Sequence, residues 1–318
     1  MIDLIAAIGN TPLVKLRKAH NQRTEIFGKL EYLNPNGSIK DRTALAIIDD
    51  AMLKGYLHQG CSVVESSSGN MAIALAQICA YHGMTFTAVI DPKANRLNLK
   101  ILQSYGANIE MVDQPLINGG WLGARVSRVK EMIRSNPDLH WTNQYQNQAN
   151  RKAHFKTMEE IAIELNHQVD YIFVSTSTCG TLMGCHDYIT DAKMNTRIVA
   201  VDAMGSAIFN SEPRERLIPG HGASTRSYLL DFDAVYDHIL VSDGDCVRGC
   251  KMLMEEQTIF AGGSSGGVYL AATRYLKNLP SSTRSAMIFC DRGERYLDTV
   301  YNDEWVLSNI PNDELHGE

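Results

Sequence analysis

Residues 34–42 read Asn-Pro-Asn-Gly-Ser-Ile-Lys-Asp-Arg, a turn-rich segment that runs directly into an apolar helical pattern. The pattern predicts Lys40 in the first turn of that helix, with Ser38 as the N-cap and Asp41 completing a capping box. A lysine amine there faces unpaired helix N–H groups, whose partial positive charge favours its neutral, nucleophilic form. Such an amine can hold an aldehyde as a Schiff base. An isolated lysine at a helix start is more often a solvated side chain, so the choice depends on the rest of the chain.

The composition is that of a globular protein, and 318 residues are enough for two domains. A net charge of −6 argues against general binding to nucleic acid or to an anionic membrane. No apolar run approaches the roughly 20 residues that span a bilayer, and the start Met1-Ile2-Asp3-Leu4 lacks the features of a signal peptide. The seven cysteines form no Cys-x-x-Cys pair, so neither a metal nor a disulfide framework is expected. We therefore expect a cytoplasmic protein.

Short β-rich runs alternate with helical ones, which predicts an α/β fold with mostly parallel strands. The candidate strands are 26–32, 62–65, 86–90, 109–112, 171–174, 197–201, 238–241 and 286–289. The candidate helices are 39–54, 71–81, 96–105, 125–135, 155–165, 183–189, 246–256 and 268–276. Gly55, Gly83 and Gly106 each follow a helix where a left-handed cap is expected. The Ser-Asn-Pro-Asp run at 135–138 interrupts the pattern and marks a weak domain boundary nearby.

Three loops rich in glycine and hydroxyl groups each connect a strand to a helix. The first, 65–70, reads Glu-Ser-Ser-Ser-Gly-Asn and suits a carboxylate. The second, 175–181, reads Ser-Thr-Ser-Thr-Cys-Gly-Thr and can surround a phosphate, but it lacks the Walker and dinucleotide motifs. The third, 261–267, holds four glycines in seven residues, which predicts a close backbone approach. Each loop alone also fits an ordinary strand-to-helix turn.

Together and in this order, these motifs resemble the fold-type II pyridoxal-phosphate enzymes, the family of cysteine synthase and cystathionine β-synthase. The run Asp-Arg-Gly-Glu-Arg-Tyr-Leu at 291–297 is similar to the C-terminal signature of the cysteine-synthase branch, and the match covers about residues 8–300. The resemblance implies a tryptophan-synthase-β-like α/β fold with two domains, each a mostly parallel twisted sheet flanked by helices. A smaller mobile domain would span 36–142, and a larger one would combine 1–35 with 143–318. It also implies a homodimer.

The resemblance assigns roles to individual residues. Lys40 would carry pyridoxal 5'-phosphate as an internal aldimine and act as the general base, Asn70 would bind the ring oxygen, and Ser264 would face the pyridine nitrogen. A neutral serine leaves that nitrogen unprotonated, which permits β-elimination and disfavours transamination and racemisation. The phosphate cup would be formed by Ser177, Thr178, Cys179, Gly180 and Thr181. The substrate α-carboxylate would be held by Ser67, Ser68 and Gln144.

The sequence departs from cysteine synthase at several expected pocket positions. Ser177 and Cys179 replace glycines of the cup, Met71 stands where a threonine follows the asparagine, and Tyr145 replaces a phenylalanine. Sulfide needs neither hydroxyls nor cations to hold it, so these changes favour a larger, polar nucleophile. Arg125 is predicted at a helix start, where a cation needs an anionic ligand. An ordinary surface position explains Arg125 equally well.

These departures, with segments 106–112, 198–206 and 259–264, resemble the siderophore-pathway branch of the family. That branch joins O-phospho-L-serine, through an aminoacrylate, to L-glutamate, giving N-(2-amino-2-carboxyethyl)-L-glutamate, a precursor of 2,3-diaminopropionate. We hypothesise that Arg125, Tyr145 and Ser177 bind the glutamate carboxylates. Residues 220–226 resemble a lid, on which Arg226 is a candidate for the substrate phosphate. The alternatives are a cysteine synthase using O-acetylserine or O-phosphoserine with sulfide, and a non-catalytic module that docks a partner or senses an amino acid.

Overall fold

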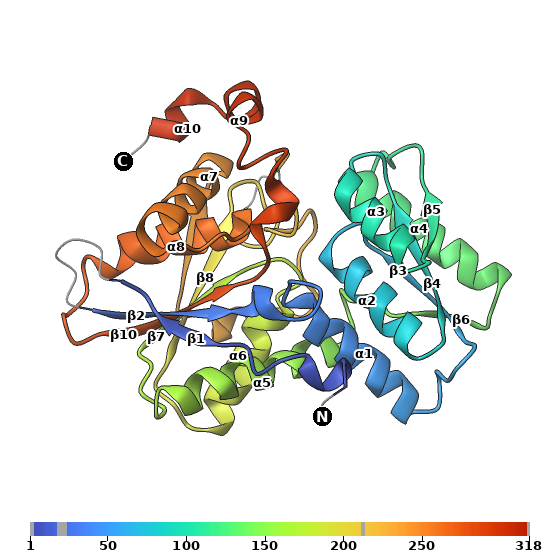
Figure 1. The fold of residues 1–318 in the computed structure, drawn as a ribbon, viewed down its shortest axis with the longest axis horizontal. Helices are drawn as coiled ribbons and strands as arrows, with labels where there is room; N and C mark the ends of the chain where they lie inside the picture. The colour runs from blue at the N-terminus through green and yellow to red at the C-terminus, as the bar shows by residue number, and fades with distance from the viewer. Residues whose placement is uncertain (1–2, 18–23, 211–213, 317–318) are drawn as a thin grey trace.

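The computed structural model describes residues 3–17, 24–210 and 214–316, so Met1 and Ile2 of the N-terminal run lie outside it. Its chain forms two sheets, each flanked by helices, and the sheets occupy the two lobes seen in Figure 1. All described strand pairs are parallel except that of β1 with β2. The predicted α/β class with mostly parallel strands is therefore confirmed.

The larger sheet has six strands in the order β1-β2-β10-β7-β8-β9. Their bounds, in chain order, are β1 Leu13–Lys15, β2 Glu25–Leu30, β7 Tyr171–Ser175, β8 Arg197–Ala203, β9 Asp237–Val241 and β10 Arg284–Phe289. Strand β10 lies between β2 and β7, so the last strand of the chain is central in the sheet. The four inner strands, β2, β10, β7 and β8, are mostly buried, as expected for parallel strands covered on both faces.

The smaller sheet has four strands in the order β5-β4-β3-β6, and all its pairs are parallel. Their bounds are β3 Ser62–Ser66, β4 Thr85–Ile90, β5 Asn108–Met111 and β6 Leu139–Trp141. Strand β6 was not predicted, because its residues directly follow the run that was interpreted as a boundary. That segment is instead an edge strand of the smaller sheet, paired with β3.

Helices cover both sheets and bury four apolar clusters. In the larger lobe, α7 and α8 pack on one face and α5 and α6 on the other; in the smaller lobe, α1, α2 and α3 share one cluster and α4 packs on the opposite face. The helices are α1 Lys40–Leu53, α2 Asn70–Tyr81, α3 Arg96–Ser104, α4 Gly120–Ser135, α5 Gln148–Glu164, α6 Gly180–Asp191, α7 Asp243–Met252, α8 Gly263–Leu276, α9 Asp303–Asn309 and α10 Asn312–His316. No described helix combines the length and the apolar character needed to cross a membrane.

The glycines predicted to end helices do so. Gly55, Gly83 and Gly106 have φ angles of 76°, 65° and 73°, which is the left-handed region that glycine enters without a steric penalty. Several helices begin earlier than predicted, because glycine, polar and hydroxyl residues occupy their first turns. Helix α8, for example, starts at Gly263 within the glycine loop, and α5 starts at Gln148 after an Asn147 cap.

Candidate active site

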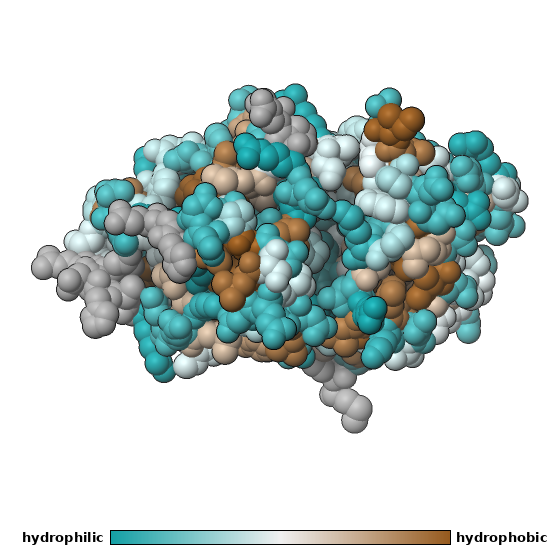
Figure 2. Space-filling view, turned by 90° about the horizontal axis from the view of Figure 1, so that it is seen from above, coloured by the Kyte–Doolittle hydropathy of each residue, from teal (hydrophilic) through white to brown (hydrophobic). Residues whose placement is uncertain are grey.

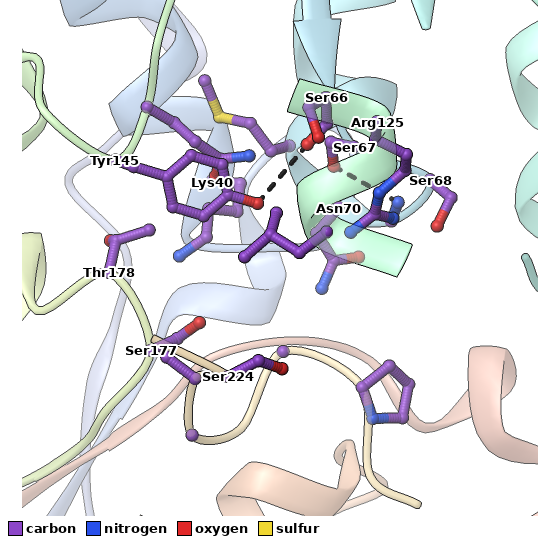
Figure 3. A pocket seen from close by; sticks show the side chains of 18 of the residues that line it. Lys40, Ser66, Ser67, Ser68, Asn70, Arg125, Tyr145, Ser177, Thr178 and Ser224 are labelled. Carbon is purple, nitrogen blue, oxygen red and sulfur yellow. Dashed lines mark hydrogen bonds between the residues drawn. The ribbon is translucent and has the colours of Figure 1, made fainter. Parts of the chain in front are cut away.

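Lys40 and the three predicted loops line one cavity of about 660 Å³ between the two sheets. Strands β3 and β7 both end at this cavity, so the loops that follow them meet there, as the carboxyl ends of parallel strands commonly do. Figure 2 shows the seam between the lobes, whose visible rim is mostly hydrophilic. Figure 3 shows Lys40, Asn70, Tyr145 and Arg125 on one side of the cavity, with Ser177 and Ser224 facing them.

The turn that carries Lys40 is held by the C-terminal signature. Ile39 N donates to Cys290 O at 2.8 Å and Arg292 N donates to Gly37 O at 3.2 Å, while Arg295 donates to Asn36 O. A Cβ atom on Gly37, whose φ is 78°, would lie 2.8 Å from Arg292 Cδ, so this close approach requires glycine. Two motifs 250 residues apart therefore form one rigid support.

The predicted capping box at this helix is wrong. The N-cap of α1 is Ile39 and no side chain caps it; Ser38 Oγ accepts weakly from Lys40 N at 3.3 Å. Asp41 instead accepts from Asn36 N at 2.7 Å, because the turn brings that N–H back over the helix. Burial raises the pKa of Asp41 to about 7, against the hydrogen bond from Asn36. Lys40 is the first residue of α1, so it lies in the first turn of the helix, as predicted.

Burial lowers the pKa of the Lys40 amine, and the neighbouring Cys290 and Asp291 oppose that shift. The direction of the pKa shift is set by desolvation, because loss of water destabilises the charged ammonium more than the neutral amine. A larger fraction of Lys40 is consequently neutral and nucleophilic at pH 7 than for an exposed lysine. The sequence argument, which invoked the helix N-terminus, predicted the direction correctly, but burial is the main cause.

Asn70 begins α2 and points toward a buried carboxylate that the sequence argument missed. Its Nδ2 donates to Asp291 Oδ2 at 2.7 Å, and Tyr296 OH donates to the same oxygen at 2.8 Å. Burial raises the pKa of Asp291, although the charge of Arg295 opposes this. Asn70 Oδ1 and Asp291 Oδ1 are buried with no partner in the described chain. One amide N–H of Asn70 also remains available to a ring oxygen.

The second loop has the geometry of an anion cradle at the N-terminus of α6. Cys179 adopts a left-handed conformation at φ 63° as the N-cap, and a Cβ on Gly180 would lie 2.1 Å from Asn150 Oδ1. Within the described ranges, nothing accepts a hydrogen bond from the backbone N–H groups of Ser177, Cys179 and Thr181. Free N–H groups at a helix N-terminus attract phosphate. Thr178 is held by Asn150 Nδ2, which donates to its Oγ1 at 3.1 Å.

The third loop places Ser264 in the first turn of α8, where it lines the cavity. Its hydroxyl has no hydrogen-bond partner among the residues that the structure describes, so it is free to meet a ring nitrogen. The glycines of this loop have two different uses. A Cβ on Gly262 would lie 2.1 Å from Asp291 Oδ1, beside the cavity, whereas one on Gly266 would lie 2.4 Å from Cys246 O in α7. Part of the glycine pattern therefore serves helix packing.

Ser67 and Ser68 line the cavity, and Gln144 approaches it from the segment after β6. Glu65, which is fully buried, joins the strand end just before the two serines to the segment that carries Gln144. Its Oε1 accepts from Ser66 N at 2.7 Å, and its Oε2 accepts from Thr142 Oγ1 at 2.6 Å and from Gln144 N at 2.9 Å. Burial raises the pKa of Glu65, and these hydrogen bonds oppose the shift. Glu65 thus fixes the two substrate-facing segments against each other, a role that its position before the serines did not reveal.

Arg125 lies in the second turn of α4, not at a helix start as predicted. Gly119 and Gly120, with φ angles of 120° and 54°, start the helix earlier. Its anionic partner belongs to the chain, because Arg125 NH1 lies 3.1 Å from Asp91 Oδ2. Arg125 Nε is buried and unpartnered in the described chain. Nearby, burial raises the pKa of Tyr145 to about 12, and the charge of Arg125 opposes that shift.

Tyr145 and Ser177 complete the polar part of the cavity. Tyr145 OH donates to Ser66 O at 3.4 Å, and Ser177 lies across the cavity in the cup (Figure 3). Arg226 also lines the cavity, but it is exposed and its guanidinium stacks 4.6 Å from the ring centre of Phe232. The structure thus brings every predicted site residue to this cavity or to its cup. The sequence argument missed Asp91, Asp291 and Glu65. It also missed Arg216, which lines the cavity from the segment between β8 and β9.

The residues present fit pyridoxal phosphate. The cup offers unpaired N–H groups to a phosphate, Ser264 offers a free hydroxyl, and Lys40 offers an amine with a lowered pKa. Buried polar atoms that have no partner among the described residues cluster around the same space, as expected where protein groups are arranged for a polar ligand. Among them are Ser66 Oγ, Asn70 Oδ1, Arg125 Nε, Arg216 Nε and Asp291 Oδ1.

Comparisons with known proteins agree with this fit. A family model described as pyridoxal-phosphate dependent enzyme matches residues 4–291. The chain is 46% identical over 306 residues, 96% of its length and 90% of the relative's, to N-(2-amino-2-carboxyethyl)-L-glutamate synthase of Ralstonia nicotianae (strain ATCC BAA-1114 / GMI1000). A solved O-ureido-L-serine synthase is similar at a TM-score of 0.87 and 28% identity, over 96% of this chain and 98% of that one. An O-acetylserine dependent cystathionine β-synthase from Helicobacter pylori has a TM-score of 0.87 and 27% identity, over 95% and 100%.

Proposed function

Because the chain belongs to the family of pyridoxal-phosphate dependent enzymes, we propose that it catalyses β-replacement on O-phospho-L-serine with L-glutamate as the nucleophile. The product is N-(2-amino-2-carboxyethyl)-L-glutamate, which we place in 2,3-diaminopropionate and siderophore biosynthesis. The observation that carries this proposal is the 46% identity to a synthase of that name across 96% of the chain. The non-catalytic module is not supported, because Lys40, Asn70 and Ser264 converge on one cavity.

When bound, pyridoxal phosphate withdraws electrons from the substrate α-carbon, which eases removal of the α-proton and loss of a β-substituent. Lys40 supplies the amine to which the cofactor aldehyde attaches. With pyridoxal phosphate bound, the freed amine of Lys40 would act as the general base for the α-proton, a role that its lowered pKa favours. The β-carbon–oxygen bond breaks and its electron pair leaves with phosphate. The glutamate nitrogen then bonds to the β-carbon, loses a proton, and Lys40 returns a proton to the α-carbon.

The polar residues of the cavity divide between the two substrates. We assign the α-carboxylate of phosphoserine to Ser67, Ser68 and Gln144, whose segments Glu65 holds in place. The carboxylates of glutamate go to Arg125, Tyr145 and Ser177, since Arg125 Nε has no partner in the described structure. Arg226, at the exposed edge of the cavity, is a candidate for the phosphate group. Sulfide would use none of these cationic and hydroxyl groups.

We further propose that the unit 36–142 closes over the substrates against 1–35 with 143–318, and that the enzyme acts as a cytoplasmic homodimer. Support for closure comes from the location of the cavity between the two sheets. Asp91 and Arg125 both belong to the smaller unit, so their ion pair can move as one piece with it.

A competition assay tests the assignment against a cysteine synthase. The cofactor-loaded protein is given phosphoserine with equal concentrations of glutamate and sulfide, and the products are identified by mass spectrometry. We expect the glutamate adduct and inorganic phosphate in equal amounts. Formation of cysteine with no glutamate adduct would establish that the protein is a cysteine synthase. Repeating the assay with O-acetylserine in place of phosphoserine would then show which donor that cysteine synthase uses.

A further inference from the structure

Arg216 lines the cavity from the larger-lobe side, in the segment between β8 and β9. Its NH1 donates to His221 O at 2.7 Å and its NH2 donates to Ser224 Oγ at 2.9 Å. Its Nε is buried and has no partner in the described part of the chain. A guanidinium has five N–H donors, so three of them, including the buried one, remain for a ligand.

The charge of Arg216 is not compensated by an ion pair with any described carboxylate, whereas Arg125 pairs with Asp91. The carboxylates that its charge senses are Asp202 and Asp243. Both are already occupied: Asp202 accepts from Thr176 Oγ1, Ala203 N and Phe209 N, and Asp243 accepts from Leu217 N and Ile218 N. Burial accordingly lowers the pKa of Arg216, and those two carboxylates only oppose the shift.

The loop around Arg216 is built to let this cation approach. Gly222 has a φ of 68°, and a Cβ there would lie 2.8 Å from Arg216 NH1. Gly222 N donates to Thr176 O at 2.8 Å, which ties this loop to the strand end that leads into the cup. Ser224, the partner of Arg216, lies beside Ser177 in Figure 3, across the cavity from Arg125. The two arginines therefore reach the cavity from opposite walls.

We propose that Arg216 binds the phosphate group of the amino-acid donor and carries its negative charge as that group leaves. This inference rests on the proposed function, because it takes phosphoserine as the donor. A phosphate dianion gains more from an unpaired guanidinium than from Arg125, whose charge Asp91 already offsets. Two parallel N–H···O bonds from Arg216 can hold two phosphate oxygens. Arg226 is exposed and stacked on Phe232. It is then the outer of the two cations that the phosphate would pass between the cavity and solvent.

The test compares two unreactive ligands that differ in the phosphate-like group. L-2-amino-4-phosphonobutyrate has a CH₂ in place of the ester oxygen of phosphoserine, and L-2-aminobutyrate lacks the phosphonate. Both affinities are read from the visible absorbance band of the cofactor-loaded protein. In Arg216→Gln we expect the phosphonate ligand to bind at least tenfold more weakly and aminobutyrate to change less than twofold. Arg216→Lys should restore part of the loss.

Arg214→Gln is the matched control, because that side chain is exposed on the same segment and does not line the cavity. The proposal would be overturned if Arg216→Gln weakened the binding of both ligands equally, which would mean that Arg216 only supports the loop. It would also be overturned if the binding of neither ligand changed. A raised KM for glutamate with unchanged phosphonate affinity would equally refute it. If wild-type protein shows no preference for the phosphonate, the proposed donor fails as well, and that result is distinct from failure of Arg216 alone. Cofactor content and unfolding midpoint verify that each variant is folded.

Discussion

Arg125 is engaged by a carboxylate, Asp91, in the cavity that we propose also accepts an anionic nucleophile. One N–H group, Nε, is left buried and unpartnered in the described structure, so a glutamate carboxylate can add to the pair without displacing Asp91. Removal of Arg125 leaves Asp91 as an uncompensated, nearly buried charge facing the incoming substrate. We therefore propose that the pair selects the nucleophile: the arginine would attract its carboxylate, and the aspartate would limit the excess of positive charge.

We expect Arg125→Ala to lower kcat/KM for glutamate by tenfold or more, since it removes a charge-assisted hydrogen bond worth about 1.5–3 kcal/mol. The spectral change on adding phosphoserine alone, and the first equivalent of phosphate released, should be unaffected. Stopped-flow absorbance and a phosphate assay measure the two half-reactions separately. Arg128→Ala is the control on the same helix, because Arg128 pairs with Glu110 and Glu131 outside the cavity. Equal loss of both half-reactions would mean that Arg125 serves the fold or the first substrate.

At the scale of single residues, the groups that the sequence could locate were those in contiguous motifs. Lys40, Asn70 and Ser264 each open a helix after a recognisable loop, so their direction follows from local structure. Asp91 and Arg216 gave no such signal. Their importance depends on whether the charge of each is neutralised by a residue far away in the sequence. Such a pairing cannot be deduced from the sequence alone. Asp291 stood at the head of a recognised signature, but its burial against Asn70 depends on the tertiary fold.

Helix α1 is anchored to the larger sheet by a buried charge network just after Lys40. Arg42 Nε lies 2.7 Å from Glu31 Oε2, and Arg42 NH2 lies 2.7 Å from Glu160 Oε2 on α5. Lys29 on β2 adds a second cation 2.7 Å from the same Glu160 oxygen. The network fixes the first turns of the helix that begins at Lys40. The proposed closure of the unit 36–142 would therefore pivot at the start of α1, whose first turns stay with the larger sheet.

This network makes stability depend on pH in a defined direction. Burial raises the pKa of Glu160, but hydrogen bonds and charges from Arg42 and Lys29 outweigh it and lower the pKa to about 2. The folded pKa lies below the unfolded value of 4.5, so the contribution is fully present above about pH 4.5 and is lost as pH falls toward 2. Allowing for partial exposure, it is worth about 1–3 kcal/mol.

We expect Glu160→Gln to reduce the difference in unfolding free energy between pH 5.5 and pH 3.5 relative to wild type. Urea unfolding followed by circular dichroism at the two pH values measures it. Glu159→Gln serves as the control, because Glu159 pairs with Lys156, whose side chain is exposed, on the same helix. An unchanged difference in Glu160→Gln would show that the ion pairs contribute nothing to acid sensitivity.

At the scale of elements, apolar strands and strongly periodic helices were predictable, and errors concentrated where glycine or short segments govern structure. Helix α4 begins five residues before Arg125 because two positive-φ glycines turn the chain at 119–120. Strands β1 and β6 have three residues each, too few for an alternating pattern to be detected. In the four-glycine loop, one glycine lies beside the cavity and another lets α8 contact α7. The composition of the loop alone could not distinguish these two uses.

At the scale of the whole molecule, the cavity lies between two sheets. Each sheet is built from different segments of the chain. The smaller sheet supplies the serine loop and Arg125, and the larger supplies the cup, Ser264 and Arg216. Parallel strands followed from the alternating sequence pattern, and the two-lobed architecture followed from the family resemblance. The relative placement of the lobes could not be predicted from it, because it depends on contacts such as Asn70 with Asp291 that join distant segments.

We expect binding of phosphoserine to slow amide hydrogen exchange in residues 66–70 and 116–126 of the cofactor-loaded enzyme. Closure would bury these segments against the larger lobe and reduce their local opening. Mass spectrometry of peptic fragments measures the exchange, with helix α7 as an internal reference. Protection confined to the cup, with no change in 116–126, would indicate that substrates bind to a cleft that does not close.

Strand β10 is the last strand made and lies in the middle of the larger sheet, between β2 and β7. During synthesis, Lys40 and the cup leave the ribosome while the space for β10 is still open. The segment after β10 then delivers Asp291 and the hydrogen bonds that hold the Lys40 turn. Until that segment is in place, neither the middle of the larger sheet nor the Lys40 turn has its final hydrogen-bond partners. We therefore expect chains that end before Asp291 to bind no pyridoxal phosphate.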